Sequence, residues 1–253
     1  MPSEVALKHF VLNGGKEFLS HISIDSVVFG FHDNQLKVLL LKMNSSEFWG
    51  LPGGFVRKEE TVEQAAMRIL KERTGIEEIF LHQFGVFSDP ARSNPFLQRK
   101  MFTDKGVEID EGNWALQRFI SIGFFALVEF SQVIPKSDIF SDECFWVNLE
   151  DANNLMMDHE TILGKALDAL RLQLSYQPVG YNLLPEKFTM PELQRLYETI
   201  LGHPLDRRNF QRKMLSYNIL IKLNERREGV AHKAPSLFKF DLERYSQALK
   251  EGL

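Results

Sequence analysis

The chain has 253 residues and a formal net charge of −4, with 44% hydrophobic and 25% charged residues. This length buries a sizeable core and divides most readily into two domains, and the ordinary composition excludes a disordered or fibrous chain. The single cysteine, Cys144, excludes an internal disulfide. It lies in the apolar run ECFWV, so we expect it to pack as a small hydrophobic residue in a reducing compartment.

The sequence also lacks the patterns typical of membrane and secreted proteins. Its longest apolar run, 119–130, is too short to span a bilayer and contains Glu129. Residues 1–10 do not show a basic region followed by an apolar one, so we expect no signal peptide. We therefore predict a cytoplasmic protein without a membrane partner.

The first part of the chain alternates strand and helix patterns. Apolar runs at 21–31 and 35–43, separated by the turn-like HDNQ, predict a pair of strands. Residues 61–75 predict a helix in which Thr61 and Gln64 form a capping box. The same criteria predict further elements: strands at 78–89, 119–130 and 144–149, and an amphipathic helix at 158–174.

The predicted helix at 61–75 lies inside a longer spaced pattern, GFVRKEETVEQAAMRILKERTGI. This pattern resembles the Nudix box, Gly-x5-Glu-x7-Arg-Glu-U-x-Glu-Glu-x-Gly-U, in which U is a bulky aliphatic residue. The resemblance covers about residues 20–175 and implies an α/β fold, the Nudix-type α/β/α sandwich with a mixed sheet, in a domain of residues 1–176. The positions that match in register are Gly54, Glu60, Arg68, Leu70, Glu72, Gly75 and Ile76.

Two positions of the box depart from the family, because Ile69 and Arg73 stand where it has glutamate. Positions 69, 72 and 73 share one helix face, where three carboxylates can hold Mg²⁺ to polarise a diphosphate and activate water. Glu72 alone, beside a guanidinium, is a poor magnesium site. We therefore predict a structural box with no catalytic residue, no metal and no cofactor. Carboxylates elsewhere, such as Glu143, leave a Nudix hydrolase with an unusual site as an alternative.

The second part of the chain begins where Pro178, Gly180 and Pro185 interrupt the helical pattern, so we place a domain boundary between residues 176 and 177. N-cap residues and hydrophobic spacing then predict two helices, and two apolar runs predict short strands around a basic loop. A basic second helix followed by a basic hairpin is the layout of a winged helix-turn-helix domain, here 177–253. Its elements are expected at 189–202, 203–218, 219–223 and 235–240. In the second of these, Phe210, Met214 and Leu215 are expected to turn inward.

This second part carries the positive charge of the chain. Residues 187–240 contain 11 Lys and Arg against 5 Asp and Glu, a charge of +6, which leaves −10 for the rest. A basic domain on an acidic body predicts a polyanion partner, and the second helix of a winged helix enters the major groove of DNA. We predict that Arg207, Arg208 and Asn209 read bases. Further contacts, mainly to phosphates, are expected from Gln211, Arg212, Lys213, Arg226, Arg227, His232 and Lys233.

Two strings link the halves to one family. LPEKFTMPELQRLYETILGHPLDRRNFQRKM, at 184–214, resembles the C-terminal domain of Nudix-related transcriptional regulators, and DHETIL, at 158–163, is similar to another segment of that family. Its members pair a degenerate Nudix domain with a winged helix. The resemblance implies a first domain that binds a small metabolite and alters the affinity for operator DNA. Many relatives respond to ADP-ribose-type nucleotides, and a branch in Bacteroides-like bacteria, which this chain resembles more closely, responds to L-arabinose.

The predicted effector is therefore L-arabinose, with an ADP-ribose-type nucleotide as the alternative. A helix face without acids removes the magnesium bridge to a diphosphate, whereas a neutral sugar needs only hydrogen-bonding groups and an apolar or aromatic wall. The long segment 90–117 has a length that indicates function or mobility. The predicted effector-binding residues are Asp25, Lys42, Phe48, Phe87, Asp89, Arg92 and His159.

These features predict a ligand-responsive repressor of sugar utilisation genes, with double-stranded operator DNA as its partner. We expect a homodimer, because two-fold proteins read two-fold operators. Two alternatives are a Nudix hydrolase of ADP-ribose or related nucleoside diphosphates, and an ADP-ribose-sensing regulator of NAD metabolism. A third, an RNA- or protein-binding adaptor, is disfavoured by the arginine-rich helix.

Overall fold

The computed structural model describes residues 4–43, 47–77, 80–176, 181–227 and 234–251. In this part of the chain a seven-stranded mixed sheet has the order β3-β2-β1-β6-β5, with β4 paired to β1 and β7 to β2. β1 and β6 are parallel, whereas the other neighbouring pairs are antiparallel. The strands are β1 (Phe18–His32), β2 (Gln35–Met43), β3 (Trp49–Gly50), β4 (Gly53–Arg57), β5 (Phe80–Phe87), β6 (Ile120–Leu127) and β7 (Ser141–Asn148).

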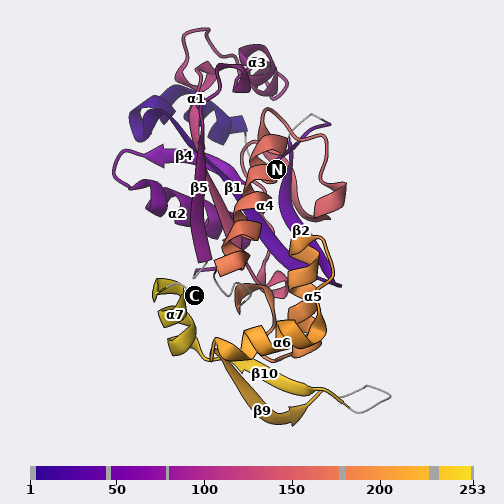
Figure 1. Cartoon of the computed structure of the whole chain (residues 1–253). Helices are drawn as coiled ribbons and strands as arrows, with labels where there is room; N and C mark the ends of the chain where they lie inside the picture. The colour runs from indigo at the N-terminus through magenta and orange to yellow at the C-terminus, as the bar shows by residue number, and fades with distance from the viewer. Residues whose placement is uncertain (1–3, 44–46, 78–79, 177–180, 228–233, 252–253) are drawn as a thin grey trace.

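Helices cover both faces of this sheet (Figure 1). The helix α2 (Val62–Thr74) packs on one face and α4 (His159–Tyr176) on the other. Alternation along β1 explains both contacts, because successive side chains of a strand point to opposite faces. Ile24 joins the buried cluster of α2, and Val27 joins the cluster of α4. The predicted α/β/α sandwich is confirmed.

Local signals determine the ends of α2 as predicted. The side chain of Thr61 accepts a hydrogen bond from the backbone of Gln64, and the side chain of Gln64 accepts one from the backbone of Thr61. Gly75 ends the helix with φ 75°, a left-handed conformation that glycine adopts at little cost, and its N–H bonds to the carbonyl of Lys71. The helix therefore begins and ends where its sequence specifies.

An N-terminal helix that the sequence analysis did not predict, α1 (Glu4–Glu17), packs against the long segment 90–117. Gly14 allows this close approach, because a Cβ at this position would lie 2.0 Å from the Trp114 ring. The segment forms η1 (Pro90–Arg92), α3 (Pro95–Thr103) and η2 (Trp114–Leu116). The residues buried between helix and segment are Leu7, Phe10, Val11, Phe102, Val107, Ile109, Ala115 and Leu116.

The second domain has the predicted winged-helix layout. In its three-stranded sheet, of order β8-β10-β9, the short β8 precedes the two helices, and the hairpin of β9 and β10 follows them. The second helix is capped by Asp206. Thr189 and Glu192 form a capping box on the first helix. The elements are β8 (Phe188–Thr189), α5 (Met190–Leu201), α6 (Arg207–Ser216), β9 (Leu220–Arg226), β10 (Ser236–Phe240) and an unpredicted C-terminal helix, α7 (Leu242–Glu251).

One expectation about the second helix of this domain is wrong. Phe210 and Met214 are buried as expected, but Leu215 is 45% exposed. Residues four positions apart share a helix face, and the next residue is rotated away from it. The buried stripe of α6 is therefore narrower than predicted.

One hydrophobic cluster runs through both domains. It joins Val27 of the central sheet and Leu170 of α4 to Leu193, Leu196 and Ile200 of α5. Figure 1 shows the end of α4 beside the winged helix, of which α5 is the first helix. The boundary predicted between 176 and 177 borders residues 177–180, which lie outside the described residues. The two domains share a core, so they are held together by packing as well as by the chain.

Two single features complete the fold. Cys144 on β7 packs beside the buried cluster of Val28 and Leu39, and burial raises the pKa of its thiol to about 12. It therefore remains a thiol and packs as an apolar residue, as expected.

Of the helices in the described ranges, none combines the length and the hydropathy that a membrane span requires.

Leu170→Ala tests the shared core. Leu170 is fully buried, so its truncation should lower the free energy of unfolding by about 2–5 kcal/mol in urea titrations. The wild type and the Leu170→Ala variant should each unfold in one transition, because the hydrophobic cluster crosses the two domains. Leu172, on the same helix but 61% exposed, is the control, and Leu172→Ala should change the free energy by at most about 0.5 kcal/mol. Equal losses of unfolding free energy in Leu170→Ala and Leu172→Ala, or two separate unfolding transitions, would contradict a shared core.

Candidate functional site

The retained Nudix-box residues brace the loop before α2 against the helix. Arg68 donates to both carboxylate oxygens of Glu60, at 2.9 Å from Nε and 2.5 Å from Nη2, and its Nη2 also donates to the carbonyl of Phe55 at 2.9 Å. Glu60 accepts a further hydrogen bond from the backbone N of Arg57 at 2.8 Å. The bonds from Arg68 lower the pKa of Glu60 and keep the carboxylate charged.

The helix face that holds a metal in a Nudix hydrolase is occupied in this chain by an apolar side chain and by guanidinium groups. Ile69 is 1% exposed and packs beneath Gly54, where a Cβ would come within 2.9 Å of its Cδ1. Glu72 lies between two guanidinium groups, 3.5 Å from Arg68 and 3.9 Å from Arg73. Across the described residues, no three His, Cys, Asp or Glu side chains are grouped to hold a metal. The residues present do not fit the magnesium ion that the fold implies, because a cation here would meet two positive charges.

Arg73 has a structural role instead. Its Nη2 lies 3.4 Å from a carboxylate oxygen of Asp138, and its Nη1 donates to the carbonyl of Ser137 at 3.1 Å. The backbone carbonyl of Arg73 accepts from the N–H of Lys136 at 3.0 Å. The residue at a metal-ligand position of the family therefore fastens α2 to the loop before β7.

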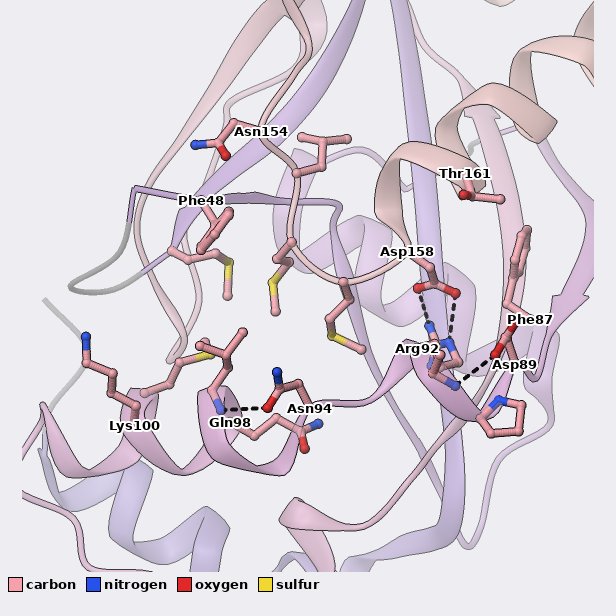
Figure 2. Close-up of a pocket in the computed structure, with 18 of the residues that line it drawn as sticks. Phe48, Phe87, Asp89, Arg92, Asn94, Gln98, Lys100, Asn154, Asp158 and Thr161 are labelled. Carbon is pink, nitrogen blue, oxygen red and sulfur yellow. Dashed lines mark hydrogen bonds and ion pairs between the residues drawn. The ribbon is translucent and has the colours of Figure 1, made fainter.

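A cavity of about 1250 Å³ opens between α3 and the start of α4 (Figure 2). Phe48 and Phe87 contribute aromatic walls, and Lys100 and Lys165 contribute positive charge. The ammonium of Lys165 lies 5.3 Å from the ring centroid of Phe87, a cation–π distance. We call this space the outer cavity. It is large enough for a nucleotide-sized ligand and combines apolar walls with charged groups.

Arg92 forms the most buried polar contacts of the outer cavity. Its Nε and Nη2 donate to the two carboxylate oxygens of Asp158 at 3.0 and 3.1 Å, and Nη2 also donates to Asp25 at 3.0 Å. Nη1 donates to the carbonyl of Phe119 at 3.0 Å. The Arg92 side chain is only 2% exposed, so each hydrogen bond compensates for lost hydration.

A smaller space of about 170 Å³, which we call the inner cavity, shares Arg92 and several methionines with the outer one. Asp25 and His159 line it and are both buried. The buried oxygens Ser93 Oγ and Gln98 Oε1, also on its wall, have no hydrogen-bond partner among the described residues. The inner cavity therefore combines unused polar atoms with an aromatic wall of Phe10, Phe55, Phe102, Phe119 and Phe140.

His159 is held as a neutral imidazole. Its Nδ1 accepts from the backbone N–H of Leu51 at 3.0 Å, and its Nε2 lies 3.6 Å from a carboxylate oxygen of Asp25. Burial lowers the pKa of His159 and outweighs the attraction of Asp25 and Asp158 for its proton. The ring thus presents an Nε2–H donor beside the inner cavity.

The structure brings together six of the seven predicted effector residues. Lys42 lines neither cavity, and its ammonium lies 5.0 Å from the ring centroid of Trp49. Its strand neighbours Leu41 and Met43 both line the inner cavity, so alternation along β2 points Lys42 to the other face. The predicted residues that line a cavity are Phe48, Phe87 and Asp89 in the outer one, Asp25 and His159 in the inner one, and Arg92 in both.

The sequence analysis missed Asp158, the principal partner of Arg92. Its position at the start of the amphipathic helix predicted at 158–174 was the available signal, since a carboxylate there either caps the helix or contacts a neighbour. The cavity methionines Met43, Met101, Met156 and Met157 also went unpredicted. A thioether has no spacing pattern that distinguishes a cavity wall from a core.

The exposed face of α6 carries the predicted base-reading residues. Arg207, Arg208 and Asn209 lie in its first turn, and Arg212 donates to the side-chain oxygen of Asn209 at 3.0 Å. Phe210 on the opposite face packs into the core. A surface with this much positive charge suits a phosphate backbone and base edges. The exposed residues of the predicted set on α6 are Arg207, Arg208, Asn209, Gln211, Arg212 and Lys213.

The two arginines of the hairpin that were predicted to contact DNA have different surroundings. Arg226 is exposed at the end of β9, whereas Arg227 forms an ion pair with Glu192 of α5. This ion pair fastens the hairpin to the first helix, so Arg227 has a bracing role that the sequence analysis did not foresee. His232 and Lys233 lie outside the described residues.

Comparisons with known proteins agree with both halves of this architecture. The NUDIX domain profile matches residues 20–169, and the NrtR DNA-binding winged helix domain profile matches residues 180–240. The chain is similar to the ADPR responsive transcriptional repressor NtrR of Acinetobacter baylyi, with 28% identity over 232 residues, covering 88% of this chain and 83% of that protein. It is 38% identical over 74 residues to the ADP-ribose pyrophosphatase of Methanocaldococcus jannaschii, covering 28% of this chain and 41% of that protein.

A solved structure extends the likeness to the whole architecture. The chain superposes on Shewanella oneidensis NrtR complexed with a 27mer DNA with a TM-score of 0.69 and 26% identity. The match covers 89% of this chain and 95% of that chain. The α/β fold and the C-terminal winged helix therefore occur in the same order in both proteins.

His159→Asn tests the neutral imidazole. A pKa lowered by folding means that stability is complete above the ordinary value of 6.5 and is lost as the pH falls below it, because the unfolded chain gains the proton first. Between pH 6.5 and 5.5 the wild-type chain should lose unfolding free energy faster than the variant, by up to about 1.4 kcal/mol per pH unit. The asparagine oxygen can still accept from the N–H of Leu51. Urea titrations at each pH measure the difference, and exposed His203→Asn should keep the wild-type profile. Equal slopes for His159→Asn and wild type would show that a charged ring is tolerated.

Proposed function

The chain belongs to the NUDIX domain family and joins that domain to an NrtR-type winged helix, and on this premise we propose that it is an effector-responsive transcriptional repressor. One observation carries the proposal. The helix face that binds metal in a Nudix hydrolase is occupied by buried Ile69 and by Arg73. The inner cavity adjoins this face through Gly54 and Asp138, and it shares the buried Arg92 with the larger outer cavity. A domain built in this way recognises a ligand without the means to hydrolyse it.

We propose that the Nudix domain has lost hydrolysis. Glu72 is the one box carboxylate on that face, and the guanidinium groups of Arg68 and Arg73 flank it. The similarity to the Methanocaldococcus jannaschii pyrophosphatase covers 74 residues, whereas the similarity to the Acinetobacter baylyi repressor covers 232. The long match supports a regulator over an enzyme.

The winged helix is the proposed DNA-binding unit. The Shewanella oneidensis relative was crystallised with DNA, and its chain superposes on almost all of this one. The exposed arginines of α6 supply what the major groove requires, and Arg226 with the adjoining hairpin supplies charge for phosphates. We further propose a cytoplasmic homodimer, because a two-fold protein matches two-fold operators, with the sensing and reading units divided at 176/177.

An ADP-ribose-type nucleotide is the effector that the relatives support best. The Acinetobacter baylyi protein is named as ADPR responsive. In this chain the outer cavity has room for a nucleotide, aromatic walls at Phe48 and Phe87, and cations at Lys100 and Lys165. Lysine side chains can pair with a diphosphate where the magnesium bridge is missing.

L-arabinose, which the sequence analysis favoured, is the second candidate. The inner cavity favours it, because a compact, hydroxyl-rich molecule can use the unpaired Ser93 and Gln98 oxygens and contact an aromatic wall. The two candidates thus use different cavities of one domain, and side chains that line only one cavity distinguish them.

A thermal-shift titration with each compound identifies the effector. At a ligand concentration of 100 Kd, the true effector should stabilise the protein by about 2.7 kcal/mol, and EDTA should not change this. Lys100 lines the outer cavity only, and Lys100→Ala should weaken the binding of ADP-ribose about tenfold. Ser93 lines the inner cavity only, and Ser93→Ala should weaken the binding of L-arabinose about tenfold. Each variant is the control for the other compound. Rapid Mg²⁺-dependent breakdown of ADP-ribose by the purified protein would falsify the loss of hydrolysis.

Arg208→Ala tests base reading by α6. The variant should lose about 1–3 kcal/mol of discrimination among operator bases, because a bidentate contact to guanine is removed. Binding to sequences selected from a random duplex pool measures this loss. Arg118→Ala removes the same charge from an exposed site of the Nudix domain and should leave base preference unchanged. If both variants bind every duplex as the wild type does, α6 is not the reading helix, and a protein- or RNA-binding role gains weight.

A further inference from the structure

Arg92 stands where the two cavities meet the start of α4. Every nitrogen of its guanidinium group donates a hydrogen bond, and its partners come from β1, from the residue before β6 and from the residue before α4. Figure 2 shows the paired hydrogen bonds to Asp158. Four of the five N–H groups of this guanidinium are thereby used, so a ligand that takes more than one hydrogen bond from Arg92 has to replace an existing acceptor. Of the two carboxylates that accept from Arg92, Asp158 is the more exposed, with 19% of its side chain accessible against 11% for Asp25.

Asp158 links this guanidinium to the helix itself. Its carbonyl accepts the first α-helical hydrogen bond of α4, from the N–H of Ile162 at 3.0 Å, while its carboxylate accepts both bonds from Arg92. The next residue, His159, is fixed by the N–H of Leu51. The position of the first turn of α4 consequently depends on groups in the cavity wall.

The helix α4 reaches from the cavity to the winged helix. It has 18 residues, which corresponds to about 27 Å at 1.5 Å per residue. Its buried residues Ile162 and Leu170 belong to the same core cluster as α5. Near its far end, Nε of Arg171 donates to the carbonyl of Ile200 in the last turn of α5, at 2.8 Å. A close-packed core transmits a shift at one end of the helix to the other.

The helix α5 in turn positions the reading helix. The rings of Tyr197 on α5 and Phe210 on α6 lie 5.2 Å apart, and the carboxylate of Glu198 accepts from the N–H of Leu205 between the helices at 2.9 Å. A displacement of α5 therefore moves the arginines of α6 relative to DNA.

We infer that Arg92 and α4 form the mechanical connection between effector and DNA. A ligand whose phosphate or hydroxyl oxygens take the place of the Asp158 carboxylate on Arg92 releases the first turn of α4 and shifts α5 and α6. Arg92 acts in this connection as a positioning residue. The inference rests on the proposed function and adds to it the route of regulation, which requires that the ligand bind the two helix positions with different affinity.

Hydrogen–deuterium exchange on the full chain, without ligand or DNA, tests the connection by itself. Arg92→Lys keeps a buried charge but loses the bidentate contact to Asp158. Amide exchange in residues 158–162 and in α5 should become at least about threefold faster, while exchange in β2 stays at the wild-type rate. Faster exchange at 158–162 with wild-type exchange in α5 would overturn the inference.

A distal variant tests the same connection where the cavity is intact. Arg171 lines neither cavity and lies outside α6. For Arg171→Ala, the Kd for a selected DNA duplex and the Kd for ADP-ribose or L-arabinose should each stay within about twofold of wild type. The change in DNA Kd that the compound causes should shrink at least about threefold. Asp168→Asn is the matched control, because Asp168 is exposed on the same helix and 3.8 Å from Arg171.

The outcomes separate the inference from the function on which it rests. A full effector response in Arg171→Ala overturns the connection and leaves the repressor proposal intact. A wild-type protein whose DNA affinity responds to neither compound contradicts the repressor proposal. The hydrogen–deuterium exchange experiment needs neither ligand nor DNA. It therefore still tests the link from Arg92 to α5 in that case, and also if Arg171→Ala fails to fold.

Discussion

The buried guanidinium of Arg92 is the interaction on which the sensing half of this protein depends. It holds Asp25 of the central sheet, Asp158 at the start of α4 and a backbone carbonyl before β6 in one place. Removing one partner of such a buried group leaves an uncompensated charge and costs about 3–5 kcal/mol. The network is therefore stable in the absence of ligand and costly to rearrange without one. That combination allows a cavity wall to act as a switch.

The Nudix box of this chain keeps its structural contacts and departs from the family at two metal-ligand positions. Arg68 and Glu60 still brace the loop before α2, and that role needs only their mutual hydrogen bonds. The metal-binding role needs several carboxylates on one helix face, and here Ile69 packs into the core while Arg73 fastens a neighbouring loop. Both substituted side chains have structural contacts of their own, so the change is integrated into the fold.

A shared core joins sensing to DNA binding. A flexible linker would let the two domains move independently, whereas one buried cluster here contains side chains from the sheet, α4 and α5. The charges are divided differently: the body is acidic and the winged helix is basic, with its arginines on the exposed face of α6. One buried cluster thus spans both domains, while the charges are separated between two surfaces. This division fits a metabolite reader attached to a DNA reader.

The sequence by itself determined the features that depend on neighbouring residues. The capping box at Thr61, the N-caps of the two helices in the second domain, the departures from the Nudix box at Ile69 and Arg73, and the arginine face of α6 follow from spacings of a few residues, and all were predicted. Tertiary structure alone decided where Arg92 finds its partners, because Asp25 and Asp158 are 67 and 66 residues away along the chain. It also excluded Lys42 from both cavities, since the direction of a strand side chain depends on which face of the sheet is covered. Periodicity records which residues share a face, but the identity of what packs against that face depends on contacts between distant segments.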